Sequence, residues 1–123
     1  MNRVILNAIF PGEPVTWKRA SFHGCRRFNP KFMRNAQKRI RRQLKMLKPT
    51  MTPDATSRFG FQATFHNSFR GDGDNFEKLV LDALTGIVWA NDEQVDEGQW
   101  RKVCDHTEPR IHLIVYEIKR IEF

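Results

Sequence analysis

The chain has 123 residues, 40% of them hydrophobic, and a formal net charge of +7 at pH 7. This length predicts one domain with a hydrophobic core, and no stretch approaches the length of a membrane span. Arg3 interrupts the first apolar run, which argues against a signal peptide, and the two cysteines match no zinc motif. We therefore expect a cytoplasmic protein with reduced thiols, no membrane partner and no organic cofactor.

The charge is divided unevenly along the chain. Residues 1–50 contain 13 lysines and arginines and one acidic residue, Glu13, whereas residues 51–123 contain 13 acidic and eight basic residues. A strongly basic half indicates a polyanionic partner such as DNA. An acidic half repels the same partner unless a divalent cation intervenes. The charge distribution therefore favours DNA and a metal ion together.

The first half of the chain predicts a strand, a basic loop and a helix. The run from Arg3 to Phe10 is apolar and β-prone and ends at a Pro-Gly pair, so we expect a strand there. Residues 11–29 are expected to form an extended basic loop. Asn29-Pro30 is a typical helix start, and the helix should run to about Leu47.

Two stripes of side chains run along this expected helix. The apolar stripe should face the core and consists of Met33, Ala36, Ile40, Leu44 and Leu47. The basic stripe lies well over 90° away and is either a ridge that binds phosphates or a solvated face. The ridge comprises Lys31, Arg34, Lys38, Arg41, Lys45 and Lys48; the candidate DNA contacts are its first five residues and, in the loop, Lys18, Arg19, Arg26 and Arg27.

The second half of the chain predicts strands around one short helix. Phe59 to His66 alternates between apolar and polar residues, which is typical of a half-buried strand. Phe76 to Leu84 predicts an amphipathic helix that stops at Gly86. Further strands are expected at 87–89, 95–104 and 111–118, with a turn after the first of them. The expected fold is a single α+β domain with a mixed sheet and two main helices.

Three aspartates are expected at the ends of neighbouring strands. Asp72 and Asp74 follow the strand that ends at His66, and Asp92 lies in the turn after the short strand expected at 87–89. In an extended loop, residues two apart direct their side chains the same way, so Asp72 and Asp74 can share one cation. Asp92 would then supply a third carboxylate, and carboxylate oxygens suit Mg²⁺.

A structural interpretation of the same segment stays open. Asp74 and Glu77 have the spacing of a capping box at the start of a helix, and Lys78 can pair with Asp82 on an exposed helix face. This interpretation explains Asp74 without a metal ion. It leaves Asp72 and Asp92 unexplained.

Residues 72–95 resemble the core signature of the RusA family of Holliday junction resolvases. The matching runs are Asp72-Gly73-Asp74-Asn75-Phe76-Glu77-Lys78, Leu81-Asp82-Ala83-Leu84 and Trp89-Ala90-Asn91-Asp92-Glu93-Gln94-Val95, and the stretch from Gly12 to Ala20 is similar to the family's N-terminal segment. The resemblance implies a small homodimeric endonuclease of a bacterium or phage, associated with the nucleoid. It implies Mg²⁺ as the cofactor, with Mn²⁺ as a substitute, and four-way DNA junctions as the substrate.

The resemblance also assigns roles to particular residues. Asp72, Asp74 and Asp92 would be the metal ligands and catalytic carboxylates, and Lys78 would be the functional lysine. Asn91 departs from the pattern, because some relatives have a second acid at that position. Asp92 itself is retained, so the departure bears on the strength of metal binding.

The expected function is resolution of Holliday junctions by paired, symmetric nicks. Lys78 lies one helical turn after Asp74, so it should point at the same site and hold the scissile phosphate or orient the attacking water. Phe69 is either a wedge that stacks on an unpaired base or a packing residue, and Arg70 beside it is a further candidate DNA contact. Two alternatives stay open: a nuclease of flaps, forks or replication intermediates, and a DNA-binding module without catalysis.

Overall fold

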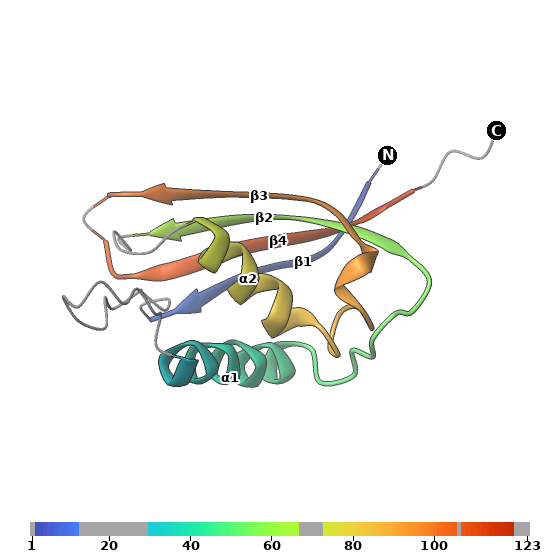
Figure 1. The fold of residues 1–123 in the computed structure, drawn as a ribbon, viewed down its shortest axis with the longest axis horizontal. Helices are drawn as coiled ribbons and strands as arrows, with labels where there is room; N and C mark the ends of the chain where they lie inside the picture. The colour runs from blue at the N-terminus through green and yellow to red at the C-terminus, as the bar shows by residue number, and fades with distance from the viewer. Residues whose placement is uncertain (1, 13–29, 67–72, 106, 120–123) are drawn as a thin grey trace.

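The computed structural model describes residues 2–12, 30–66, 73–105 and 107–119, with the backbone alone at 30–33 and 73–75. These residues form four strands, two main helices and one short 3-10 helix (Figure 1). No helix in the described ranges is both long and apolar enough to cross a membrane. The elements are β1 (Arg3–Pro11), α1 (Pro30–Leu47), β2 (Arg58–His66), α2 (Gly73–Leu84), η1 (Asp92–Gln94), β3 (Val95–Val103) and β4 (Arg110–Ile118).

The four strands make one mixed sheet in the order β1-β4-β2-β3. β4 pairs antiparallel with both β1 and β2, whereas β3 pairs parallel with β2 and forms an edge of the sheet. Every second residue of β2 is a buried apolar residue, as the alternation of the sequence predicts, and α1 and α2 lie on that face of the sheet (Figure 1). The predicted α+β class, the mixed sheet and the two helices are confirmed.

The apolar stripe of α1 packs against this core over most of its length. Ala36, Ile40 and Leu44 are buried, as predicted. The prediction is wrong for Leu47, whose side chain is 56% exposed. Leu47 is the last residue of the helix, where no other described element covers the stripe.

The segment after α2 differs from the prediction. Residues 87–89 were expected to form a strand, but the chain turns at Gly86, which has a φ of 88°, and Trp89 makes only isolated bridges. The backbone N–H groups of Ile87 and Val88 donate to the carbonyl of Leu84, so the C-terminus of α2 satisfies them without a sheet partner. All three apolar side chains of the segment are buried, which explains why the sequence looks like a short core strand.

Candidate active site

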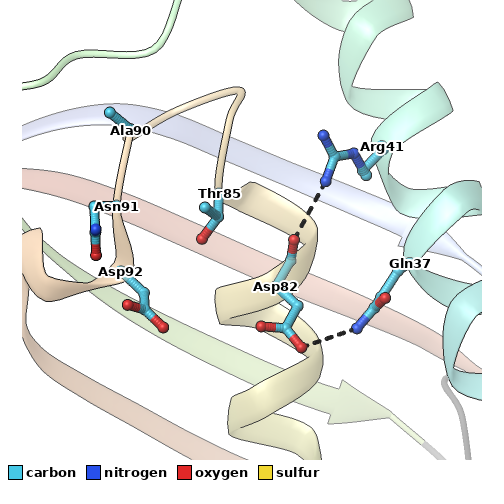
Figure 2. Close-up of a pocket in the computed structure, with 7 residues that line it drawn as sticks. All are labelled: Gln37, Arg41, Asp82, Thr85, Ala90, Asn91 and Asp92. Atoms are coloured by element: carbon cyan, nitrogen blue, oxygen red, sulfur yellow. Dashed lines mark hydrogen bonds between the residues drawn. The ribbon is translucent and has the colours of Figure 1, made fainter. Parts of the chain in front are cut away.

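Asp92 is the first residue of η1, the turn that leads into β3. It is exposed and borders an open pocket of about 450 Å³ between α1, the end of α2 and the turn (Figure 2). Within the described parts of the chain, no hydrogen bond or ion pair uses the Asp92 carboxylate. The carboxylate is therefore available to a ligand. The pocket is lined by Gln37, Arg41, Asp82, Thr85, Ala90, Asn91 and Asp92.

A second carboxylate, that of Asp82, faces the same pocket from the last turn of α2 (Figure 2). Gln37 Nε2 donates a hydrogen bond to Asp82 Oδ2 at 3.3 Å, and Lys78 Nζ lies 3.4 Å from the same oxygen. Arg41 donates to the backbone carbonyl of Asp82 at 3.4 Å. The sequence indicated only an exposed Lys78–Asp82 pair. It did not reveal that α1 reaches across to Asp82.

Gln94 holds the turn that carries Asp92. This side chain is only 6% exposed and uses both ends of its amide. Oε1 accepts from the backbone N–H groups of Ala90 and Asn91 at 3.0 Å, and Nε2 donates to the carbonyls of Asp54 and Ser57 at 2.8 and 2.9 Å. A buried side chain with four satisfied hydrogen bonds fixes the backbone around it. Sequence reasoning did not single out Gln94, because a glutamine in a sequence does not by itself indicate burial or particular hydrogen-bond partners.

Replacing Gln94 by Leu is expected to destabilise the fold and the turn around Asp92. The change replaces the amide by an apolar group of similar size. It leaves the Asn91 N–H and the Ser57 carbonyl without this hydrogen bond and the Ala90 N–H and the Asp54 carbonyl bonded only to each other, which should lower the free energy of unfolding by at least about 1 kcal/mol. Urea denaturation monitored by circular dichroism measures this loss. Gln99→Leu, on an exposed position of β3, is the matched control and should change stability by less than about 0.5 kcal/mol.

Asp54 anchors the other side of this turn. Its backbone N–H donates to the carbonyl of Val88, and its carbonyl accepts from the N–H of Ala90, both at 3.1 Å. The backbone N–H groups of Ser57 and Thr56 donate to its carboxylate at 2.8 Å each and lower the pKa of Asp54 to about 2. Asp54 is therefore ionised at neutral pH, and its hydrogen bonds tie the segment before β2 to the segment before η1.

The described backbone places Asp74 far from Asp92. Asp74 lies in the first turn of α2, whereas Asp82, beside Asp92 in the pocket, lies slightly more than two turns later, a rise of about 12 Å. The extended-loop geometry predicted for Asp74 is wrong, because α2 already begins at Gly73. The same boundary puts Asp74 inside the helix and not at its N-cap. Asp72 lies outside the described residues.

The position of Asp92 relative to the sheet also separates it from Asp74. Because β2 and β3 are parallel and pair from Phe59–Val95 to His66–Val103, η1 lies at the end of the sheet where β2 begins. The chain leaves β2 for α2 at the opposite end, after His66. The sequence predicted a strand ending just before Asp92, and no such strand exists among the described residues to carry Asp92 to that end. Within one protomer, Asp74 and Asp92 lie at opposite ends of α2.

Lys78 occupies the position between these two ends. Asp74, Lys78 and Asp82 recur every four residues along α2, so their positions share one face of the helix. The Lys78 ammonium turns toward Asp82, and the side chain is 56% exposed. Lys78 is therefore close to the pocket and still accessible to a ligand.

The basic ridge of α1 adjoins the pocket. Arg34, Lys38 and Lys45 are exposed along α1, and Arg41, which is half-buried on the same ridge, lines the pocket and donates to the backbone carbonyl of Asp82. A phosphate backbone that lies along the ridge would therefore pass beside the carboxylates. Lys31 is described only in its backbone, and the other candidate DNA contacts fall outside the described residues: Lys18, Arg19, Arg26, Arg27, Phe69 and Arg70.

The described residues of the pocket include ligand types that suit a hard divalent cation, but too few of them to form a complete site. The Asn91 amide oxygen accepts from the Glu93 N–H, and the Thr85 hydroxyl is hydrogen-bonded to Leu81 and Trp89. The pocket therefore offers mainly the carboxylate oxygens of Asp82 and Asp92. These are the oxygen ligands that Mg²⁺ prefers. Among the residues with described side chains, however, no group of three or more His, Cys, Asp or Glu residues could hold a metal ion. At least one further acid is needed to complete such a site.

Comparison with known families adds one match. The family model described as endodeoxyribonuclease RusA matches residues 11–116, which is most of the chain and includes the segment 72–95. No curated protein matches the chain. The resemblance drawn from residues 72–95 is confirmed.

Proposed function

Because this chain belongs to the RusA family of endodeoxyribonucleases, which act on Holliday junctions, we propose that it is a homodimeric, Mg²⁺-dependent enzyme that resolves four-way junctions by paired nicks. The observation that carries the proposal is the position of Arg41. This residue belongs to the basic ridge of α1 and also lines the pocket that contains Asp82 and Asp92. A surface suited to phosphate therefore continues directly into a group of carboxylates, which is the arrangement that a metal-dependent nuclease requires.

The carboxylates would hold the metal ion, with Asp92 as the ligand from the pocket and Asp72 and Asp74 as the further acids. When bound, Mg²⁺ lowers the pKa of a coordinated water and neutralises charge on the scissile phosphate and the leaving oxygen. Asp92 suits this role because its carboxylate is exposed and unpaired within the described residues. Asp82 is already engaged by Gln37 and Lys78, so its role is to orient these side chains.

The basic side chains around the pocket would position the DNA. Lys78 can donate to the scissile phosphate, and Asp82 limits the directions that its ammonium can take. Arg41 is tied to the Asp82 carbonyl by one guanidinium nitrogen, which leaves other N–H groups for a phosphate oxygen. These two residues would fix the phosphate beside Asp92 without taking part in proton transfer.

The separation of the acids supports a dimer. One Mg²⁺ binds its oxygen ligands at about 2.1 Å, so it cannot join carboxylates that lie at opposite ends of α2. A two-fold dimer with its α2 helices antiparallel would place the first turn of one helix, with Asp74, beside the last turn of the other, which carries Asp82 and lies next to Asp92 of η1. Such a dimer contains two complete sites related by symmetry. Two sites of this kind match the two cuts that resolve a four-way junction.

A comparison of DNA substrates tests the proposed activity. With Mg²⁺ present, the protein should nick a four-way junction on two opposing strands and cut a linear duplex at least about tenfold more slowly. Preferential cutting of a fork or flap would assign it to the wider class of structure-selective nucleases. Binding without any nicking in Mg²⁺ or Mn²⁺ would contradict the proposal and leave a DNA-binding module.

Neutralising the ridge is expected to weaken binding to every DNA form. The double variant Lys38→Gln/Lys45→Gln removes two charges from α1, and the slope of log K against log salt should fall by roughly 0.9 for each phosphate that the protein no longer neutralises. Binding titrations without a divalent metal, at several salt concentrations, measure the slope. Arg3→Gln/Lys119→Gln removes the same charge from the termini of the sheet and should leave the slope close to that of the wild type.

A further inference from the structure

Trp100 is an exposed aromatic residue at the edge of the sheet. It lies on β3, and 40% of the residue is exposed to solvent, whereas Trp89 is fully buried. In register with Ala63 of β2, it lies on the face of the sheet that carries the helices. A large aromatic surface is therefore open to solvent next to α2.

The inner side of Trp100 is held by a series of aromatic rings. The centre of the Phe65 ring lies 4.4 Å from that of Phe76, and the centre of the Phe76 ring lies 6.2 Å from that of Trp100. Phe65 and Phe76 are both buried, so the series runs from the core to the surface. Gly98 leaves room for the ring of Phe61 to lie against β3, because a Cβ atom at this position would lie 2.5 Å from that ring. The indole thus has a fixed backbone and a fixed support.

Trp100 has a cation on its own face of the sheet and lies next to the first turn of α2. Lys102 follows it by two residues on the same face of β3, and its Nζ lies 5.0 Å from the centre of the Phe76 ring. Arg101 faces the other side of the sheet, where its Nε lies 3.5 Å from Thr64 Oγ1. Phe76 belongs to the first turn of α2 and follows Asp74 by two residues, a rise of about 3 Å. The aromatic surface therefore lies beside the turn that carries Asp74.

We propose that Trp100 stacks on an unpaired base at the branch point of the DNA substrate, with Lys102 beside a flanking phosphate. An exposed aromatic ring with a cation on the same face suits unpaired nucleic acid, because stacking tolerates any base. The inference rests on the proposed function, since it takes branched DNA as the ligand. It adds an interaction that recognises unpaired bases and therefore separates a junction from a duplex.

Binding measurements without a divalent metal test this interaction. Trp100→Ala should weaken binding to a four-way junction by roughly fivefold or more and leave binding to a linear duplex unchanged, because base pairs at a branch point open more readily than those inside a duplex. Trp100→Phe keeps an aromatic face and should retain most of the junction affinity. Val4→Thr, at an exposed position on the opposite edge strand, is the control and should bind as the wild type does.

A fluorescent base locates the stacked nucleotide. A junction with 2-aminopurine at its branch point should lose fluorescence on binding the wild type and Trp100→Phe, and should keep it with Trp100→Ala. Equal weakening of junction and duplex binding in Trp100→Ala, or no weakening of either, would overturn the proposal. A monomeric Trp100→Ala in sedimentation would assign the residue to the interface between subunits and overturn it too. A wild type that binds junction and duplex equally would instead contradict the proposed function.

Discussion

Asp92→Asn is expected to reduce cleavage of a four-way junction by at least about 100-fold while junction binding persists. The substitution removes a negatively charged oxygen ligand without enlarging the side chain, so it should impair metal binding more than it alters the surface. The Asp92 side chain has no hydrogen bond or ion pair among the described residues, so the variant should fold normally. Removing a negative charge near bound phosphate should, if anything, tighten binding in the absence of metal.

The neighbouring residue provides a control for this prediction. Glu93→Gln makes the same change of charge in the same 3-10 turn. The hydrogen bond between Glu93 and Arg58 uses the backbone carbonyl of Glu93, so the substitution does not remove it. The variant should retain cleavage within about threefold of the wild type. Cleavage is measured as nicked product over time in Mg²⁺, and binding is measured by gel shift without metal. Near-wild-type cleavage by Asp92→Asn would remove Asp92 from the site.

The elements of the fold were largely predictable because their signals are local. The alternation in β2, the Pro30 start of α1 and the Gly86 stop after α2 each reflect the backbone chemistry of a few adjacent residues. The segment at 87–89 was not predictable in this way. Three consecutive apolar residues indicate burial, and burial is compatible with both a strand and a turn closed by hydrogen bonds to α2 and Asp54.

The candidate site was predictable in its residue types and not in its geometry. The sequence pointed to Asp92, but the supports of its turn, Gln94 and Asp54, are joined by a hydrogen bond between residues 40 positions apart in the chain. The relation between Asp74 and Asp92 depends on strand order. Only the parallel pairing of β2 with β3 places η1 at the far end of α2. Such a pairing is a property of the whole sheet, so short motifs do not contain it.

Mixed dimers of two inactive variants are expected to recover cleavage at one site. In the proposed dimer, Asp74 of one protomer and Asp92 of the other share a metal ion. A heterodimer of Asp74→Asn with Asp92→Asn therefore has one site with both substitutions and one site with neither. The intact site should nick one strand of a junction at roughly half the wild-type rate per dimer, although both homodimers are inactive. If each protomer built its own site, both sites of the heterodimer would carry a substitution and no nicking would return.

The heterodimer is obtained by expressing the two variants with different affinity tags and purifying on both tags in succession, which removes the parent homodimers. The matched control is a heterodimer of Asp72→Asn with Asp74→Asn, in which both substitutions belong to the same end of α2 or the loop before it. Each site of that heterodimer carries one substitution whether the site is shared or not, so it should stay inactive. Nicking by the first heterodimer alone would establish that Asp74 and Asp92 act across the dimer. Inactivity of both would contradict the shared site. Each protomer would then have to bring its own Asp74 and Asp92 together, although they lie at opposite ends of α2.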